Sequence, residues 1–162
     1  IINRCYLANQ SEIDFEKLEQ LYKELVKETE KELSKADFET GFFTELYSPA
    51  DENNITKLDR CFYTTYNANY LDIVRRLIEQ KVPAEYRHFF IAPLLSEASI
   101  HANTAGIFKG FYKNSKTGAG QFGGNGKNAL SRIMGKISLQ FPVFSEFNAK
   151  QEYSAKMQIL LF

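Results

Sequence analysis

The run AEYRHFFIAPLLSEASIHA, from Ala84 to Ala102, decides how the rest of the chain folds. Its apolar residues recur at helical spacing but fall on more than one face of the expected helix. They are Tyr86, Phe89, Phe90, Leu94, Leu95, Ala98 and Ile100. A helix of this kind belongs in a core, so we expect it at the centre of the fold. Pro83 suits its first turn, and Pro93 should kink it by removing one amide donor.

Two further helices are expected on the N-terminal side of this one. The run Ser11-Glu12-Ile13-Asp14 resembles a capping box, and apolar residues then recur at helical spacing as far as Leu33. Another helix follows Thr64 and should stop before Pro83. Helices near 11–35, 65–81 and 84–102 predict a mainly α fold with a three-helix core and little strand. Residues 37–62 lack periodicity and are expected to be irregular.

Beyond the central helix, helical periodicity is lost. The alternating run 137–141 predicts a short strand that Pro142 closes. We therefore divide the chain into a helical core (1–102), a glycine-rich basic segment (103–136), and a strand with a tail (137–162), within a single domain or domain fragment. The apolar run 157–162 suggests a piece of a longer protein; the alternative is a tail docked into its own core.

Composition excludes several functional classes. No apolar run approaches the roughly 18 residues of a membrane span. Cys5 and Cys61 lack metal-ligand spacing, and the two histidines cannot complete a zinc site with them. We interpret both cysteines as reduced, partly buried residues of a cytoplasmic protein. No arrangement of serine, histidine or paired carboxylates indicates a catalytic site, so no catalytic residue and no metal ligand is assigned.

The stretch from Ala98 to Ser145 contains no Asp and no Glu, although the whole chain has a net charge of zero. It carries six cations and eight of the nine glycines, together with Phe108, Phe111, Tyr112 and Phe122. Lysine and arginine neutralise phosphates, glycine lets backbone amides approach an anion, and aromatic faces can stack on bases. This combination favours an anionic partner, and the alternative is a flexible loop whose lysines serve solubility. Without DNA, we expect residues 113–128 to be mobile, since glycines raise backbone entropy there.

A nucleotide-binding loop is a poorer interpretation of the same glycines. Residues 118–123 fit the pattern GxGxxG, but the residues before them do not form an apolar strand. Gly126 and Lys127 lack the spacing and the following Ser or Thr of a phosphate loop.

Three stretches resemble the adenine-specific DNA methyltransferases of restriction–modification systems, the DNA-adenine-methylase family. They are SEASIHANTAGIFKGFYK at 96–113, NRCYL at 3–7, and FYTTYNA at 62–68 followed by Leu71, Asp72, Arg75 and Arg76. The likeness covers most of residues 1–148, and its most specific part is the run ANTAG at 102–106. The resemblance implies that a helix ends at this run beside the active site and that a target-recognition loop follows.

The resemblance also implies that the chain is a fragment of a larger α/β methyltransferase, and it implies which parts lie outside this chain. Relatives bind S-adenosylmethionine through a glycine motif upstream and hold the target base with an Asp-Pro-Pro-Tyr motif, expected beyond Phe162. We therefore expect this chain alone neither to bind the cofactor nor to methylate DNA. The expected partners are double-stranded DNA and the remainder of the methyltransferase. The DNA-binding residues expected are Asn103, nearest the base, with Thr104, Gly106, Lys109, Lys113, Lys116, Lys127 and Arg132.

Two other functions fit the same residues. The chain is alternatively a helical DNA-binding module without chemistry, or a helical protein-interaction domain whose basic loop contacts an acidic partner. A glycine motif upstream and an Asp-Pro-Pro-Tyr motif downstream would establish the methyltransferase.

Overall fold

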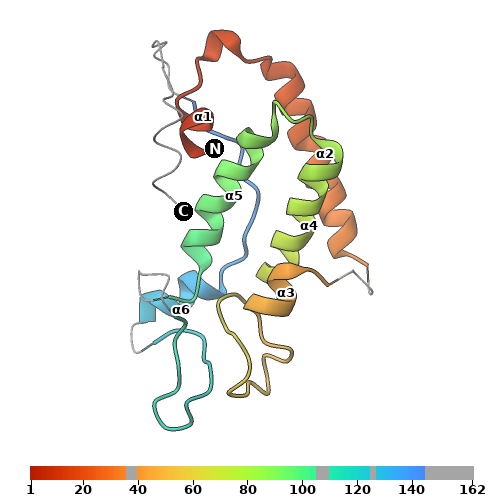
Figure 1. The fold of residues 1–162 in the computed structure, drawn as a ribbon. Coiled ribbons are helices and arrows are strands. Elements are labelled where there is room, and N and C mark those ends of the chain that lie inside the picture. Colours follow the sequence, from red (N-terminus) through yellow and green to blue (C-terminus); the bar gives the residue numbers. More distant parts are fainter. Residues whose placement is uncertain (36–39, 105–109, 125–126, 145–162) are drawn as a thin grey trace.

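The computed structural model describes residues 1–35, 40–104, 110–124 and 127–144. This part of the chain is mainly helical and contains no β-strand (Figure 1). Its α-helices are α1 (Ile2–Tyr6), α2 (Phe15–Leu33), α3 (Phe42–Tyr47), α4 (Thr65–Lys81), α5 (Arg87–His101) and α6 (Lys127–Met134), and a 3₁₀ turn, η1, covers Gln10–Glu12.

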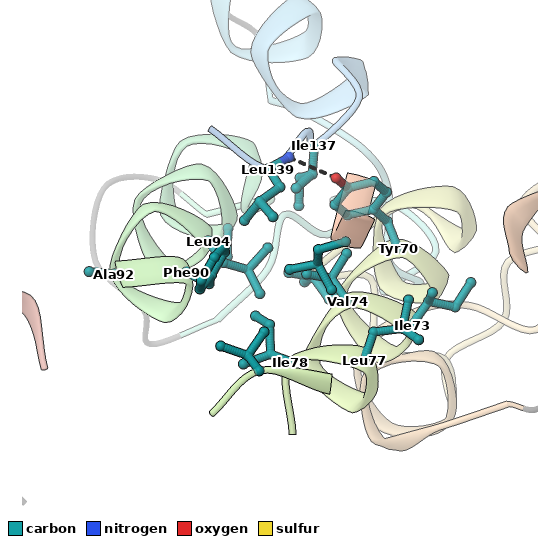
Figure 2. Packing of buried hydrophobic residues seen from close by; sticks show 14 of the residues in the cluster. Tyr70, Ile73, Val74, Leu77, Ile78, Phe90, Ala92, Leu94, Ile137 and Leu139 are labelled. Carbon is teal, nitrogen blue, oxygen red and sulfur yellow. Dashed lines mark hydrogen bonds between the residues drawn. The ribbon is translucent and has the colours of Figure 1, made fainter. Parts of the chain in front are cut away.

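The core lies between α2, α4 and α5. Helices α4 and α5 run side by side in opposite directions, and α2 packs on the other side of α4 (Figure 1). Figure 2 shows Val74 and Ile78 of α4 and Phe90 and Leu94 of α5 meeting in this core. Phe90 is 0% exposed, as expected for a helix that is apolar on several faces. The prediction of a central helix near 84–102 is therefore confirmed.

The three predicted helices are present, with corrections at two starting points. Asp14, not Ser11, caps α2, because its carboxylate accepts the N–H of Lys17 at 3.0 Å. Helix α4 begins as predicted, with the Thr64 hydroxyl accepting the N–H of Asn67 at 3.2 Å. Pro83 does not lie in the first turn of α5. It opens a separate turn, closed by the N–H of Tyr86 on the Pro83 carbonyl, and α5 starts only at Arg87.

The predicted strand at 137–141 is wrong. These residues are extended, but they bond to side chains of the helices instead of to a neighbouring strand. The Ile137 N–H donates to Asn67 Oδ1 at 2.9 Å. Figure 2 shows the Leu139 N–H donating to the Tyr70 hydroxyl, at 2.7 Å. The Tyr22 hydroxyl donates to the Leu139 carbonyl at 2.8 Å. The extended segment, residues 136–144, thus covers the core between α4 and α5.

Sequence periodicity missed three short helices, which are α1, α3 and α6. Helix α3 lies in the region expected to be irregular, and α6 lies within the basic segment expected to be non-helical. Helix α3 is capped from a distance, since the Asp72 carboxylate accepts the N–H groups of Phe43 and Thr44 at 2.9 and 2.8 Å. Gly41 permits this contact, because a Cβ there would lie 2.6 Å from Asp72 Cγ. Short helices held by such distant partners leave little periodic signal.

Both cysteines are free and 0% exposed, which is deeper burial than expected. Burial raises the pKa of each thiol to about 11. Within the described ranges, no helix combines the length and apolar character needed to cross a bilayer.

Candidate nucleic-acid interface

Two long loops meet at the end of the molecule opposite α1. The first loop, residues 48–64, joins α3 to α4, and the second loop, residues 110–124, lies between α5 and α6 (Figure 1). They touch closely, since a Cβ on Gly120 would lie 2.4 Å from Cys61 Sγ. The rings of Phe62 and Phe111 also meet edge to face, 5.1 Å apart. These contacts make one surface of two segments far apart in sequence.

Asn103 fastens the two loops together. It is 0% exposed and follows the end of α5 by two residues. Its Nδ2 donates to the carbonyls of Cys61 at 2.6 Å and Gln121 at 2.8 Å, and its Oδ1 accepts the N–H of Gly123 at 3.0 Å. Its backbone N–H donates to the Phe62 carbonyl at 2.8 Å. All the hydrogen-bonding capacity of the amide nitrogen is therefore used inside the protein.

The second loop is a short hairpin with a side-chain-closed turn. Isolated antiparallel bridges pair Thr104 with Phe111 and Lys113 with Gly120. The Asn114 Oδ1 accepts the N–H groups of Lys116 and Thr117 at 3.0 and 3.1 Å, which builds the turn. Gly118 completes it at φ 72°, a left-handed conformation that favours glycine.

Cations and aromatic rings alternate across the two loops. The Arg60 guanidinium lies over the rings of Tyr47 and Phe62, 4.9 and 5.6 Å from their centroids. Phe62 meets Phe111, and the Lys113 ammonium lies 5.4 Å from the Phe111 centroid. We call these five residues the cation–aromatic ladder. Such contacts contribute about 0.5–1 kcal/mol each at exposed sites and hold the cations over the rings.

Lys57 and Lys116 add two exposed cations next to the ladder. Lys57 Cε lies 3.8 Å from the position of a Cβ on Gly118, so the first loop reaches the turn of the second.

The first loop also contains three carboxylates, and each accepts a backbone N–H. Asp51 accepts from Asn53 at 2.9 Å, and Glu52 accepts from Thr65. Asp59 accepts from Ala50 and from both the N–H and the hydroxyl of Thr56. These Thr56 hydrogen bonds hold the pKa of Asp59 below its usual value. The carboxylates therefore shape the first loop as well as charging it.

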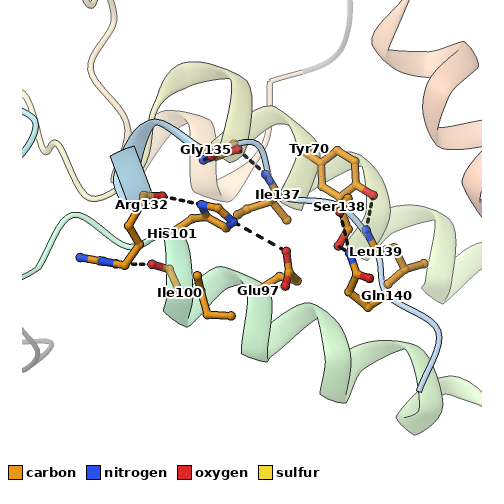
Figure 3. Close-up of polar contacts among 11 residues, drawn as sticks. Tyr70, Glu97, Ile100, His101, Arg132, Gly135, Ile137, Ser138, Leu139 and Gln140 are labelled. Atoms are coloured by element: carbon orange, nitrogen blue, oxygen red, sulfur yellow. Dashed lines mark hydrogen bonds and ion pairs between the residues drawn. The ribbon is translucent and has the colours of Figure 1, made fainter. Parts of the chain in front are cut away.

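Arg132 has a different position from the other predicted phosphate ligands. Its guanidinium donates to the carbonyl of Ile100 (Figure 3) and to those of Ala102 and Thr104, at 2.9 and 3.3 Å. Arg132 thereby caps the C-terminal end of α5. The Arg132 carbonyl lies 2.6 Å from His101 Nδ1, and His101 Nε2 lies 3.7 Å from a carboxylate oxygen of Glu97. This network joins α6 to α5 behind the two loops.

The predicted DNA-binding residues thus separate into groups. Lys113 and Lys116 are exposed on the second loop, whereas Asn103 and Thr104 are buried beneath it. Gly106, Lys109 and the side chain of Lys127 lie outside the described residues. The sequence interpretation missed Lys57 and Arg60, whose only signal was two cations near aromatic residues in a loop of mixed charge.

The described residues hold no group of three His, Cys, Asp or Glu side chains suited to a metal ion. A hollow of about 490 Å³ lies at the other end, between α1 and the start of α5, and includes Arg4, Glu85 and His88. Comparisons with protein-family models, curated proteins and solved structures found no match to this chain.

Proposed function

We propose that this chain is the DNA-facing portion of a site-specific DNA adenine methyltransferase. In the intact enzyme, S-adenosylmethionine supplies the methyl group for the exocyclic amine of a flipped adenine. The remainder of the enzyme binds that cofactor and holds the target base. The observation that carries the proposal is the cation–aromatic ladder, which joins two distant loops at the end of α5.

The ladder supplies the two contacts that nucleic acids require. Lys57, Arg60, Lys113 and Lys116 present positive charge toward solvent and suit phosphate oxygens. Rings beneath the cations orient Arg60 and Lys113, so these side chains lose less conformational freedom when they bind. The backbone of the second loop, with glycine at its turn, permits close approach of a phosphate.

Asn103 and Arg132 position this surface under the proposal. Asn103 fixes the spacing of the two loops, and Arg132 fixes the end of the helix from which the second loop departs. Contact of Asn103 with the target base stays a prediction from the family resemblance. In the structure, the side-chain amide of Asn103 is buried and donates to the carbonyls of Cys61 and Gln121.

The test is the salt dependence of DNA binding. Lys113→Ala with Lys116→Ala should weaken binding to every duplex and flatten the logarithmic salt slope by up to about two, at about −0.9 per phosphate contact. The matched control is Lys23→Ala with Lys27→Ala, two exposed lysines of α2. It should leave the slope unchanged. Fluorescence anisotropy of a labelled duplex over a range of salt concentrations measures both.

The same experiment separates the alternatives. If the loop variant retains the wild-type salt slope, the lysines serve solubility and the proposal is wrong. If an acidic polypeptide such as polyglutamate competes as well as duplex DNA, the chain is a protein-interaction domain. A third outcome is that the chain binds duplex DNA but the complete gene encodes neither the glycine motif nor the Asp-Pro-Pro-Tyr motif. The chain is then a DNA-binding module without chemistry.

A further inference from the structure

Leu58 is far more exposed than any other leucine in the described part of the chain. Its side chain is 93% exposed, whereas the other exposed leucines, Leu7, Leu46, Leu95 and Leu130, lie between 42% and 47%. Leu58 lies in the first loop, between Lys57 and Arg60. An apolar side chain so fully hydrated gains no burial free energy from folding. Folding alone therefore does not explain a leucine at this position.

The turn beneath Leu58 holds it in this position. The Asp59 carboxylate accepts the Thr56 N–H at 2.7 Å and the Thr56 hydroxyl at 2.6 Å. A second oxygen of Asp59 accepts the Ala50 N–H at 3.2 Å, and the Leu58 N–H donates to the Thr56 hydroxyl at 3.2 Å. The carboxylate thus braces the turn from both sides while the leucine side chain extends away from the protein.

Lys57 directly precedes Leu58, Asp59 separates it from Arg60, and this part of the first loop adjoins the second loop. Lys57 reaches the turn at Gly118, and Arg60 lies over Tyr47 and Phe62. Side chains that insert between base steps are typically leucine, isoleucine, phenylalanine, methionine or proline, and basic residues beside them contact the backbone. An apolar tip with Lys57 directly before it and Arg60 two residues after it, beyond the hydrogen-bonded carboxylate of Asp59, matches that arrangement.

We propose that Leu58 is an apolar wedge that enters a base step of the bound duplex while Lys57 and Arg60 contact the flanking phosphates. This inference rests on the proposed DNA-binding function and adds a residue to it. Partial unstacking of one step opposes insertion, and the contacts that the bent duplex makes with the ladder compensate for it. Leu58 thereby favours sequences whose steps unstack easily, such as TA and CA/TG.

The test compares the full chain and its Leu58→Ala variant on two labelled probes. One probe is an intact duplex of mixed sequence, and the other is the same duplex with a single unpaired base that opens the stack in advance. Leu58→Ala should bind the intact duplex at least about tenfold more weakly, and the unpaired-base duplex with a much smaller loss. Leu58→Phe should restore binding to the intact duplex. The salt slope should stay at the wild-type value in both variants, since no charge is changed.

The controls make failure informative. Leu95→Ala, an exposed leucine of α5, should bind both probes like the wild type. Melting temperatures should be unchanged in every variant, because these side chains are exposed. Equal affinities of wild type and Leu58→Ala on the intact duplex overturn the wedge and leave the proposed function standing. Absence of salt-dependent DNA binding in the wild type overturns the proposed function itself. If Leu58→Ala loses binding only to anionic phospholipid vesicles, the leucine is a membrane contact and the wedge is wrong.

Discussion

The side-chain amide of Asn103 donates to the carbonyl oxygen of Cys61, 2.6 Å away and 42 residues earlier in the chain. The same nitrogen reaches Gln121, 18 residues later. One buried amide thus replaces the hydrogen bonds that a sheet would otherwise supply between these segments. The geometry of the interface depends on this side chain more than on regular secondary structure.

Asn103→Ala should therefore destabilise the whole chain. Two carbonyls and one N–H lose their partner in a buried site, and each loss costs about 1–3 kcal/mol before relaxation. We expect the free energy of unfolding in urea to fall by about 2–4 kcal/mol. Asn54→Ala, an exposed asparagine of the first loop, is the control and should change it by less than about 0.5 kcal/mol.

The family resemblance predicts that Asn103→Ala lowers turnover in the intact enzyme with no change in salt slope. The structure adds a route to that result, through distortion of both loops. A variant with wild-type stability and wild-type loop geometry but no turnover would instead favour direct contact with the base.

Gly120→Ala should destabilise the contact between the two loops. The new methyl group would lie 2.4 Å from Cys61 Sγ and 3.1 Å from Cys61 Cβ, so one loop must move. We expect a loss of about 1–3 kcal/mol in unfolding free energy, as for other overpacked sites. Gly110→Ala has no atom within 4 Å of its new Cβ and serves as the control. Cys61→Ala should partly rescue Gly120→Ala, and additive losses in this double-mutant cycle would disprove the contact.

Arg132→Ala should act on stability and not on phosphate contact. The guanidinium donates to three carbonyls at the end of α5; losing it removes this donor from Ile100 and Thr104, whereas Ala102 keeps the N–H of Thr104. Thermal or urea unfolding should show a loss of about 1–3 kcal/mol. Arg75→Ala on the exposed face of α4 should cost less than about 0.5 kcal/mol. A flattened salt slope with unchanged stability would restore the sequence-based assignment of Arg132 to a phosphate.

His88 should make the fold less stable in mild acid. Burial lowers the pKa of His88, and the positive charges of Arg4 and the N-terminus lower it further. The unfolded chain then binds a proton more readily than the folded chain below the ordinary histidine pKa of about 6.5. Unfolding free energy should fall as pH decreases through about 6.5 toward the lowered value. His88→Gln should remove this component from urea titrations at each pH; an unchanged profile in the variant would contradict the assignment.

The sequence pattern located most of the fold because the large helices bury regular stripes. The alternation at 137–141 was interpreted as a strand, and two of its apolar residues are indeed buried, since Ile137 is 1% and Leu139 3% exposed. The prediction was wrong about the hydrogen-bonding partner of this segment, which is not a strand. Alternation reports which side chains are buried, but not whether the backbone bonds to a strand or to the side chains of Asn67 and Tyr70.

The site was less accessible to sequence reasoning. The lysines of the second loop stand out because no carboxylate surrounds them. Lys57 and Arg60 do not stand out in the sequence, since the nearby carboxylates of Asp51, Glu52 and Asp59 balance their charge. The capping role of Arg132 depends on carbonyls about 30 residues earlier, a distance in sequence at which no local pattern operates. Composition finds charge, whereas only tertiary structure assigns each charge a partner.

The extended segment completes the core, and it is synthesised after the helices that it covers. Leu139 bonds to Tyr22, 117 residues earlier, and to Tyr70, 69 residues earlier. A nascent chain on the ribosome therefore holds α2, α4 and α5 with their shared apolar face uncovered until residues 136–144 leave the exit tunnel. During that interval the face is available to other chains, and chaperones that bind exposed apolar surface have a defined target.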